Sequence, residues 1–337
     1  MPSKVIDFKA VFVLTLLLIL LAIVVSINAG YIKIPLTEVL ATFVGKGSPD
    51  HQLTLFQFRL PRIVMAILVG MGISLSGAIL QGVSQNPLAD PGILGINAGA
   101  GFAVVVYMFF FQGSALINGW ASIYVLPLTA LTGAFLAAFL VYTLAKKRGQ
   151  ITPIRLLLMG IGLTAAFNAG LIILQLKMEP SNFTRALTWL SGSIWGANWS
   201  YVWALLPWLV VLIPLALYRS RVLDILQLGE AAAMGVGVQV ARERKLLLFM
   251  AVALAGVCVA VGGGLSFLGL IAPHITRRLV GPKHSKCLPL TAAIGAFILL
   301  AADTLGRVIM APSEMPVGII VSILGVPYFI YLLIKSV

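Results

Sequence analysis

The feature that most constrains this chain is a series of apolar runs, most of them about 20 residues long, that short charged segments separate. A run of about 20 apolar residues can cross the hydrocarbon core of a bilayer as a helix. The chain is 60% hydrophobic and only 10% charged, whereas soluble domains carry about 25% charged residues. We predict an all-α polytopic membrane protein, one transmembrane domain over residues 1–337, with ten spans at 10–29, 62–84, 92–111, 122–144, 154–176, 198–218, 246–262, 266–279, 288–309 and 316–335.

Two of these assignments need an argument of their own. Residues 246–273 contain no charge and are too long for one span, and the run Gly262-Gly263-Gly264 is a poor helix interior, so we divide the region there. The first apolar run is about 20 residues long, longer than the 7–15 residues of a signal-peptide core, and it is expected to be a retained span.

The net charge of +13 indicates orientation in the membrane rather than nucleic-acid binding. The basic residues lie in short loops beside apolar runs, which is the pattern of a membrane protein oriented by its positive loops. With ten spans and both termini inside, sixteen of the 23 Lys and Arg residues lie on the inner side and seven outside. We therefore predict a multi-pass protein of the cytoplasmic membrane with both termini in the cytoplasm.

Small residues and loop-forming residues mark places where helices approach closely. The stretch GMGISLSGA at 70–78 has Gly and Ser at a spacing of four, which lets helix backbones pack against each other. The segment SQNPLADPGILG at 84–95 cannot continue a helix because of its prolines. Irregular backbone at membrane depth is tolerated only when it is buried in protein or lines a cavity.

Cysteine usage gives two local expectations. The two cysteines imply no disulfide framework. Cys258 is expected inside the seventh span, and Cys287 is expected at the inner face, within reach of an aqueous thiol reagent.

The sequence offers no catalytic or metal-binding constellation. The centres of the spans are almost free of charge; Asp303 and Arg307 come closest, lie four apart near the outer end of one span, and can pair locally. The three histidines are scattered, so we predict no metal, no cofactor and no catalytic residue. The stretch VGKGS lacks the spacing of a phosphate loop, so ATP-driven transport would need a motor on another polypeptide.

One polar segment, residues 224–245, lies between the sixth and seventh spans on the predicted inner side. Its LGEAAAMG stretch can form a short helix that ends at Gly235, because glycine adopts left-handed backbone angles without steric cost. Such a helix with one acid could dock on a partner protein. The alternative is a solvated connector.

Five ordered motifs carry a resemblance to a known family. They are RLPR (59–62), SQNPLADPGILG (84–95), LGEAAAMGVGV (228–238), GLSFLGLIAPHITRRLVG (264–281) and EMPVGIIVSILGVPYFIYLLIK (314–335). Together they resemble the permease subunits of the iron-siderophore, haem and cobalamin ATP-binding-cassette (ABC) importers, from about residue 10 to the end. The resemblance implies ten helices per subunit and two subunits around a central pathway.

The same resemblance implies roles for particular residues. It makes the inner segment a coupling helix that fits the ATPase, with Leu228, Gly229, Glu230, Ala231 and Gly235 as its key residues. It implies that the outer arginines dock an acidic binding protein, namely Arg59, Arg62 and Arg307; the alternative is that they only snorkel at helix ends, with Arg307 paired to Asp303. In the inner loop at 148–155, Gln150 and Thr152 are the gate candidates.

The expected function is that of a non-catalytic permease subunit that moves an iron-siderophore complex across the cytoplasmic membrane. Its expected partners are a second permease, identical or homologous, two ATPase subunits, an extracytoplasmic binding protein and membrane lipid, with no nucleic acid. The same architecture could instead carry haem or cobalamin. A proton-driven secondary carrier and an integral-membrane enzyme are more distant alternatives.

Overall fold

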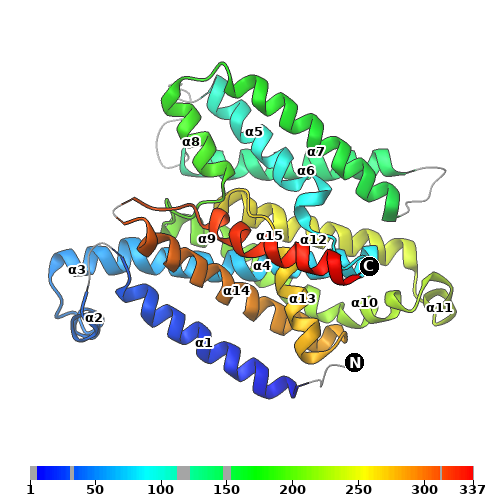
Figure 1. Ribbon diagram of the computed structural model, residues 1–337, viewed down its shortest axis with the longest axis horizontal. Helices are drawn as coiled ribbons and strands as arrows, with labels where there is room; N and C mark the ends of the chain where they lie inside the picture. Colours follow the sequence, from blue (N-terminus) through cyan, green and yellow to red (C-terminus); the bar gives the residue numbers. More distant parts are fainter. Residues whose placement is uncertain (1–5, 31–33, 112–121, 147–152, 312, 337) are drawn as a thin grey trace.

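The computed structural model describes residues 6–30, 34–111, 122–146, 153–311 and 313–336, and these residues form helices joined by short connections (Figure 1). The first half contains α1 (Phe8–Asn28), α2 (Leu36–Phe43), α3 (Pro49–Leu53), the π-helical turn η1 (Thr54–Arg59), α4 (Leu60–Ser84), the 3-10 turn η2 (Pro91–Leu94), α5 (Ile96–Phe110), α6 (Ser122–Ala145) and α7 (Pro153–Gln175). The second half contains α8 (Pro180–Leu190), α9 (Trp199–Tyr218), α10 (Ser220–Gln227), α11 (Glu230–Gly235), α12 (Val240–Gly262), α13 (Leu268–Val280), α14 (His284–Ile309) and α15 (Val317–Ser336).

The helices agree with a chain that crosses a membrane several times. Among the described residues, seven helical segments are long and apolar enough to span a bilayer, namely Phe8–Asn28, Pro49–Ser84, Tyr124–Ala145, Ile154–Gln175, Trp199–Tyr218, Val240–Gly262 and His284–Ile309. Shorter apolar helices lie at Ile96–Phe110 and Val317–Tyr331. The chain is therefore an all-α polytopic membrane protein, and every range predicted as a span contains a helix.

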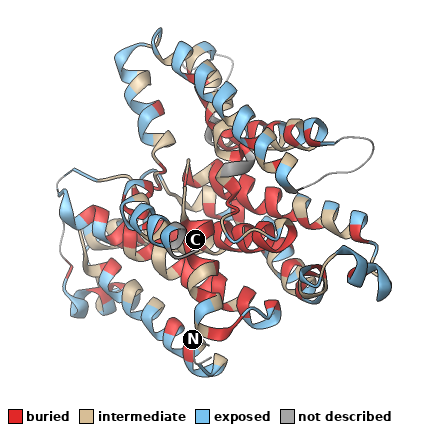
Figure 2. Cartoon of the chain, turned by 45° about the vertical axis from the view of Figure 1, so that its right-hand side comes forward, coloured by how far each residue is buried: buried red, intermediate tan, exposed pale blue. Residues whose placement is uncertain are grey.

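The helices divide into a buried centre and an exposed periphery (Figure 2). α4, α12 and α14 are mostly buried inside the chain, whereas less than a third of the residues in the apolar spans of α1, α6, α7 and α9 are buried. Figure 1 shows α5 to α8 grouped along one side of this centre, with α1 along the opposite side. An apolar periphery is what lipid tails or another membrane subunit would cover.

The helix that the glycine- and serine-rich stretch forms packs closely against three neighbours, as predicted. A Cβ at Gly70 on α4 would lie 2.5 Å from the Gly295 carbonyl oxygen on α14. A Cβ at Gly77 would lie 1.9 Å from the Gly269 carbonyl oxygen on α13. Ser76 donates a hydrogen bond of 2.6 Å to the Ala251 carbonyl on α12. Small side chains therefore allow α4 to sit at the centre of the bundle.

The division of residues 246–279 at the glycine run is also confirmed. α12 ends at Gly262, and Gly263 has a φ of +71°, which a helix cannot continue. α13 begins five residues later, at Leu268. α12 nevertheless starts at Val240, six residues before the predicted span, because the polar residues of its first turns continue the same helix.

The two cysteines differ from the expectation at one position. Cys258 is fully buried in α12, as predicted. Cys287 is only 1% exposed, so the prediction that an aqueous thiol reagent reaches it is wrong. The reason is that α14 begins at His284 rather than at residue 288, which turns Cys287 inward, with its sulfur 3.7 Å from the Thr291 hydroxyl.

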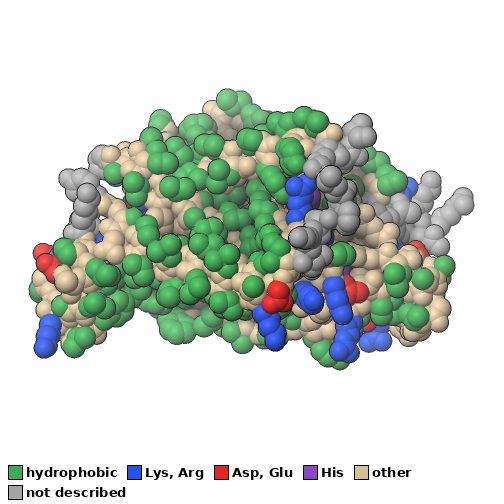
Figure 3. Space-filling view, turned by 60° about the horizontal axis from the view of Figure 1, so that its bottom comes forward, with side chains coloured by type: hydrophobic (Ala, Val, Ile, Leu, Met, Phe, Trp, Pro, Cys, Tyr) green, Lys and Arg blue, Asp and Glu red, His purple; other side chains and the backbone are tan. Residues whose placement is uncertain are grey.

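Charged side chains gather toward one end of the molecule. In the face shown in Figure 3, hydrophobic side chains cover the middle, and most of the visible Lys and Arg side chains lie toward the right. In Figure 1 that is the end where α10 and α11 lie, whereas α2 and α3 lie at the opposite end.

Candidate functional site

The connection between α9 and α12 folds into two short helices, α10 and α11. α11 begins at Glu230 and ends at Gly235, so the prediction of a short helix that ends there is confirmed. The prediction that Gly235 supplies the left-handed backbone is wrong. That conformation occurs at Gly229, with a φ of +97°, and at Gly237, with a φ of +84°, so these two glycines bracket the helix.

The turn that follows α11 explains why the left-handed residue lies two positions later than expected. The Gly237 N–H donates to the Met234 carbonyl at 2.9 Å, and the Val238 N–H donates to the Ala233 carbonyl at 3.0 Å. These bonds close the carbonyl end of the helix in the way that a left-handed glycine cap does. Gly235 has no atom within 4 Å of a hypothetical Cβ, so its site has room for a side chain.

The exposed surface of α11 and its flanks is apolar. Leu228 is 71% exposed, Met234 is 58% exposed and Val236 is 66% exposed. Glu230 lies on the same helix, largely exposed, with its carboxylate 3.8 Å from the Arg244 guanidinium. Large apolar side chains that are exposed among charged residues are typical of a protein-binding surface.

α10 ties this surface to the buried centre of the bundle. The Asp224 carboxylate accepts hydrogen bonds from the backbone N–H of His284, at 2.8 Å, and pairs with its ring Nδ1, at 2.7 Å. The Gln85 side-chain amide donates to the Leu226 carbonyl at 2.7 Å. α10 is thus held by the end of α4 and by the start of α14, two of the most buried helices.

Sequence reasoning did not find the bond between Asp224 and His284. The two residues are 60 positions apart, and neither belongs to a pattern that marks it as part of a pair.

At the end of the bundle opposite α11, the three arginines predicted to dock a binding protein lie in one buried cluster. Arg62 pairs with Asp303 at 2.8 Å and with Glu314 at 2.6 Å. Arg307 pairs with Asp303 at 3.3 Å, which confirms the local pair predicted between them. Asp303 is 1% exposed, so two guanidinium groups surround one buried carboxylate.

The remaining contacts join this cluster to the end of α1. Arg59 donates to the Ile27 carbonyl. Arg307 donates to the Ser26 hydroxyl at 2.5 Å and to the Ala29 carbonyl at 3.2 Å. The exposed fractions of the three arginines are only 6% for Arg59, 9% for Arg62 and 7% for Arg307. In this conformation they hold helices together, and docking on a binding protein stays a prediction for them.

A third feature is a groove of about 630 Å³ beside the irregular connection between α4 and α5. Asp90 is the N-cap of the turn η2, and its carboxylate accepts from the Gly92 N–H at 2.9 Å. Asn97 at the start of α5 donates to the Leu265 carbonyl at 2.9 Å. α7, the glycine run before α13, and α15 complete the walls. Of the two surroundings expected for this irregular backbone, the structure shows the wall of a cavity.

Three buried oxygen atoms of the groove have no hydrogen-bond partner among the described residues. They are Oδ1 of Asp90, Oδ1 of Asn97 and Oγ1 of Thr164. Burial raises the pKa of the Asp90 carboxyl to about 6, although the hydrogen bond from Gly92 lowers it. Buried polar atoms are usually satisfied by protein or water, so this groove is prepared to accept hydrogen bonds from a polar occupant.

Both gate candidates, Gln150 and Thr152, lie outside the described residues.

Comparisons with known proteins agree over nearly the whole chain. The model of the FecCD transport family matches residues 17–335. The iron(3+)-hydroxamate import system permease protein FhuG of Bacillus subtilis (strain 168) is 56% identical over 326 residues, which are 97% of this chain and 97% of that relative. The Fe(3+) dicitrate transport system permease protein FecD of Escherichia coli (strain K12) is 37% identical over 310 residues, which are 92% of this chain and 93% of that relative.

A solved structure is similar over nearly the same extent. It is described as an inward-facing conformation of a putative metal-chelate type ABC transporter. The TM-score is 0.85 at 30% identity, and the match covers 97% of this chain and 99% of that one. Sequence motifs, helix arrangement and relatives agree, and the chain belongs to the FecCD transport family.

Proposed function

We propose that this chain is the permease subunit of an ABC importer that moves an iron(III)–siderophore complex across the cytoplasmic membrane. The substrate class is supported by relatives that are named for iron(3+)-hydroxamate and Fe(3+) dicitrate import. A ferric hydroxamate is the favoured cargo, because the relative with that name shares 56% of its residues with this chain over 97% of the length.

The topology proposed for this function has ten transmembrane helices with both termini in the cytoplasm. The support is that α5 and α13 lie at the predicted positions between longer spans and that α15 follows the last of these spans. With this orientation, α10 and α11 lie in the cytoplasm and the arginine cluster lies outside. The sixteen-to-seven distribution of Lys and Arg then follows the positive-inside rule.

ATP hydrolysis would take place on two partner subunits, and α11 would transmit the conformational change of these subunits to the membrane helices. The observation that carries this proposal is an exposed apolar helix whose neighbour α10 is bonded to α4 and α14. A force applied to α11 would reach the buried centre through Asp224 and Gln85 rather than dissipate in a loose loop. Leu228, Gly229, Glu230, Ala231 and Gly235 remain the residues proposed for this contact.

A second permease, identical or homologous, would complete the pathway, and an extracytoplasmic binding protein would deliver the cargo to the outer end. Arg59, Arg62 and Arg307 remain the docking candidates there, together with Glu314, which is part of the same cluster. Gln150 and Thr152 remain the gate candidates. The groove at Asp90 would offer its unpaired oxygens to hydrogen-bond donors on the passing chelate.

Uptake in cells that lack other iron importers tests the substrate class. Cells with the intact system should accumulate ⁵⁵Fe bound to a hydroxamate siderophore, and deletion of this chain should abolish the accumulation. An excess of unlabelled ferric hydroxamate should compete, whereas haem and cobalamin should not. Competition by haem or cobalamin but not by ferric hydroxamate would overturn the assigned cargo, and uptake that survives ATP depletion would overturn the ABC mechanism.

A further inference from the structure

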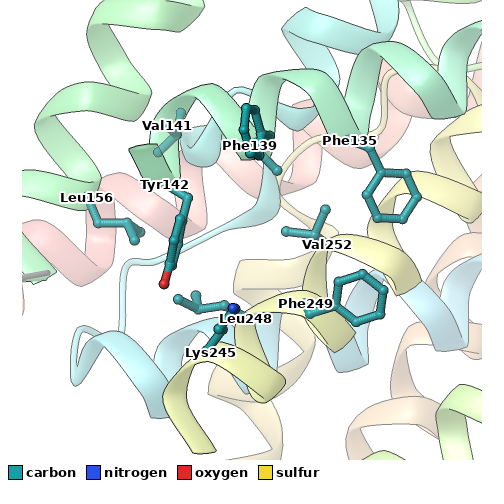
Figure 4. Close-up of a pocket in the computed structure, with 10 residues that line it drawn as sticks. Phe135, Phe139, Val141, Tyr142, Leu156, Lys245, Leu248, Phe249 and Val252 are labelled. Atoms are coloured by element: carbon teal, nitrogen blue, oxygen red, sulfur yellow. The ribbon is translucent and has the colours of Figure 1, made fainter. Parts of the chain in front are cut away.

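A second groove, of about 380 Å³, lies between α6, α7 and α12 (Figure 4), and none of its lining residues lines the groove at Asp90. Its long walls are apolar. Phe135, Phe139 and Val141 line it from α6, and Leu248, Phe249 and Val252 line it from α12. Phe139 is 62% exposed and Phe249 is 57% exposed, so the groove opens toward the surroundings of the bundle.

The two ends of the groove differ. At one end the rings of Phe135 and Phe249 are in contact, with their centroids 6.1 Å apart. At the other end Figure 4 shows Tyr142, Leu156 and Lys245, so that a phenol hydroxyl and an ammonium group lie where the apolar walls stop. Among the residues that the structure describes, Lys245 has no carboxylate partner within ion-pair distance.

Two further basic residues lie near the same end. Arg155, the neighbour of Leu156, donates from Nε to the Ala145 carbonyl at 3.0 Å. Lys146 follows Ala145 directly and is exposed. The charged end of the groove, with Lys146, Arg155 and Lys245, is thus positive, and Lys245 is ten residues beyond the end of α11.

We propose that this groove is a binding site for one phospholipid with an anionic headgroup. An acyl chain would lie along the aromatic and aliphatic walls, and the phosphate would face Lys245 and the Tyr142 hydroxyl. Three features favour this occupant. The volume is within the range of small-molecule sites, and the interior is apolar and open at the surface of the bundle. In the topology proposed above, the charged end faces the cytoplasm, and basic pockets between helices at that side recognise anionic lipid headgroups.

The position of the site gives the lipid a defined place in the molecule. α12 continues directly from the α11 surface, whereas α6 belongs to the group of helices α5 to α8 (Figure 1). A lipid between α6 and α12 would therefore bridge the helix that follows the proposed ATPase contact and the helices beside the groove at Asp90. Binding of the lipid does not depend on the identity of the transported chelate.

The test uses the full chain in phosphatidylcholine vesicles that contain a small fraction of phosphatidylglycerol with a photoreactive group on the acyl chain. After illumination, mass mapping should find the label on α6 and α12 around Phe139 and Phe249. Unlabelled phosphatidylglycerol should compete better than phosphatidylcholine with the same chains.

Lys245→Gln should weaken the competition by phosphatidylglycerol about fivefold, because one basic group near the headgroup is lost, and should leave competition by phosphatidylcholine unchanged. Lys9→Gln, which removes an exposed lysine of α1, is the matched control and should change neither. Val252→Trp should fill the groove and lower labelling at both helices.

Three results would overturn the proposal. They are equal competition by the two lipids in the unmodified protein, the same effect of Lys245→Gln and Lys9→Gln, and labelling spread evenly over the exposed helices. Because Lys245 is on the surface, its variant remains informative if Val252→Trp fails to fold.

Discussion

Replacement of Asp303 by Asn should be among the most destabilising single changes in this chain. The carboxylate of Asp303 is 1% exposed and lies 2.8 Å from a nitrogen of Arg62 and 3.3 Å from Nε of Arg307. Loss of this carboxylate would leave two buried guanidinium groups without its negative charge. Breaking a buried ion pair by removal of one partner costs about 3–5 kcal/mol.

The structure places the expected value at the lower end of that range. Asn can still accept one hydrogen bond, and Arg62 keeps its pair with Glu314 at 2.6 Å. We therefore expect a loss of about 3 kcal/mol in the free energy of unfolding. The matched control is Glu314→Gln, because the Glu314 side chain is 31% exposed and its pair is partly screened by solvent. It should cost about 1 kcal/mol or less.

The assay is reversible unfolding of the purified chain in mixed micelles, followed by circular dichroism. A double-mutant cycle with Arg62→Gln should give a coupling energy between positions 62 and 303 above about 1 kcal/mol, because contacting charges are not additive. The reasoning would be refuted if Asp303→Asn destabilised the chain no more than Glu314→Gln does.

Three further predictions concern other parts of the molecule. Gly237→Val should abolish uptake without loss of the folded bundle, because the φ of +84° at this position is strained for a branched residue, whereas Gly235→Ala should retain uptake. Equal uptake rates for the two variants would contradict the assignment of the left-handed position to Gly237. Gly77→Val should prevent folding, because a Cβ there would lie 1.9 Å from the Gly269 carbonyl oxygen, and a monodisperse, thermally stable variant would show that the helices do not approach this closely. Burial raises the folded-state pKa of Asp90 to about 6 from 3.8, so the unmodified chain should gain about 1–2 kcal/mol of stability relative to Asp90→Asn as the pH falls from 7 to 5. A difference in unfolding free energy between the two proteins that does not change with pH would show that this carboxyl is not buried.

Local features of the fold were predictable from the sequence. The length of the apolar runs located the helices, the glycine run divided α12 from α13, and the small residues of α4 indicated close packing against other helices. The short helix α11 was found with its final residue, Gly235. Each of these predictions depends on neighbouring residues, whose periodicity and backbone preferences are visible in the sequence itself.

Long-range pairing was not predictable in the same way. Arg62 and Asp303 are 241 residues apart, and the sequence suggested only the local pair of Asp303 with Arg307. Arg59, Arg62 and Arg307 were therefore predicted to contact a partner protein, although the structure shows that their side chains bind other residues of this chain. For the same reason, the bond between Asp224 and His284, which fixes α10, had no signal in either segment.

Errors of a few residues in the position of a turn or a helix start also had consequences. The left-handed backbone was assigned to Gly235 because it ends the helix, but the cap that closes α11 needs that conformation two residues later, at Gly237. Cys287 was placed at the surface because α14 was expected to begin after it, and the earlier start turned its thiol inward.

The central claim is that α11 is the surface through which an ATPase drives transport. The most direct measurement is ATP-dependent uptake of a ferric hydroxamate into proteoliposomes that contain the assembled importer, with Met234→Asp compared with Val44→Asp. Both changes place a charge on an exposed apolar residue, 58% and 72% exposed, at opposite ends of the molecule. The account predicts that Met234→Asp abolishes uptake, either with loss of the ATPase or with ATP hydrolysis that no longer drives transport, while Val44→Asp transports normally. Normal uptake by Met234→Asp, with the ATPase still bound, would contradict it.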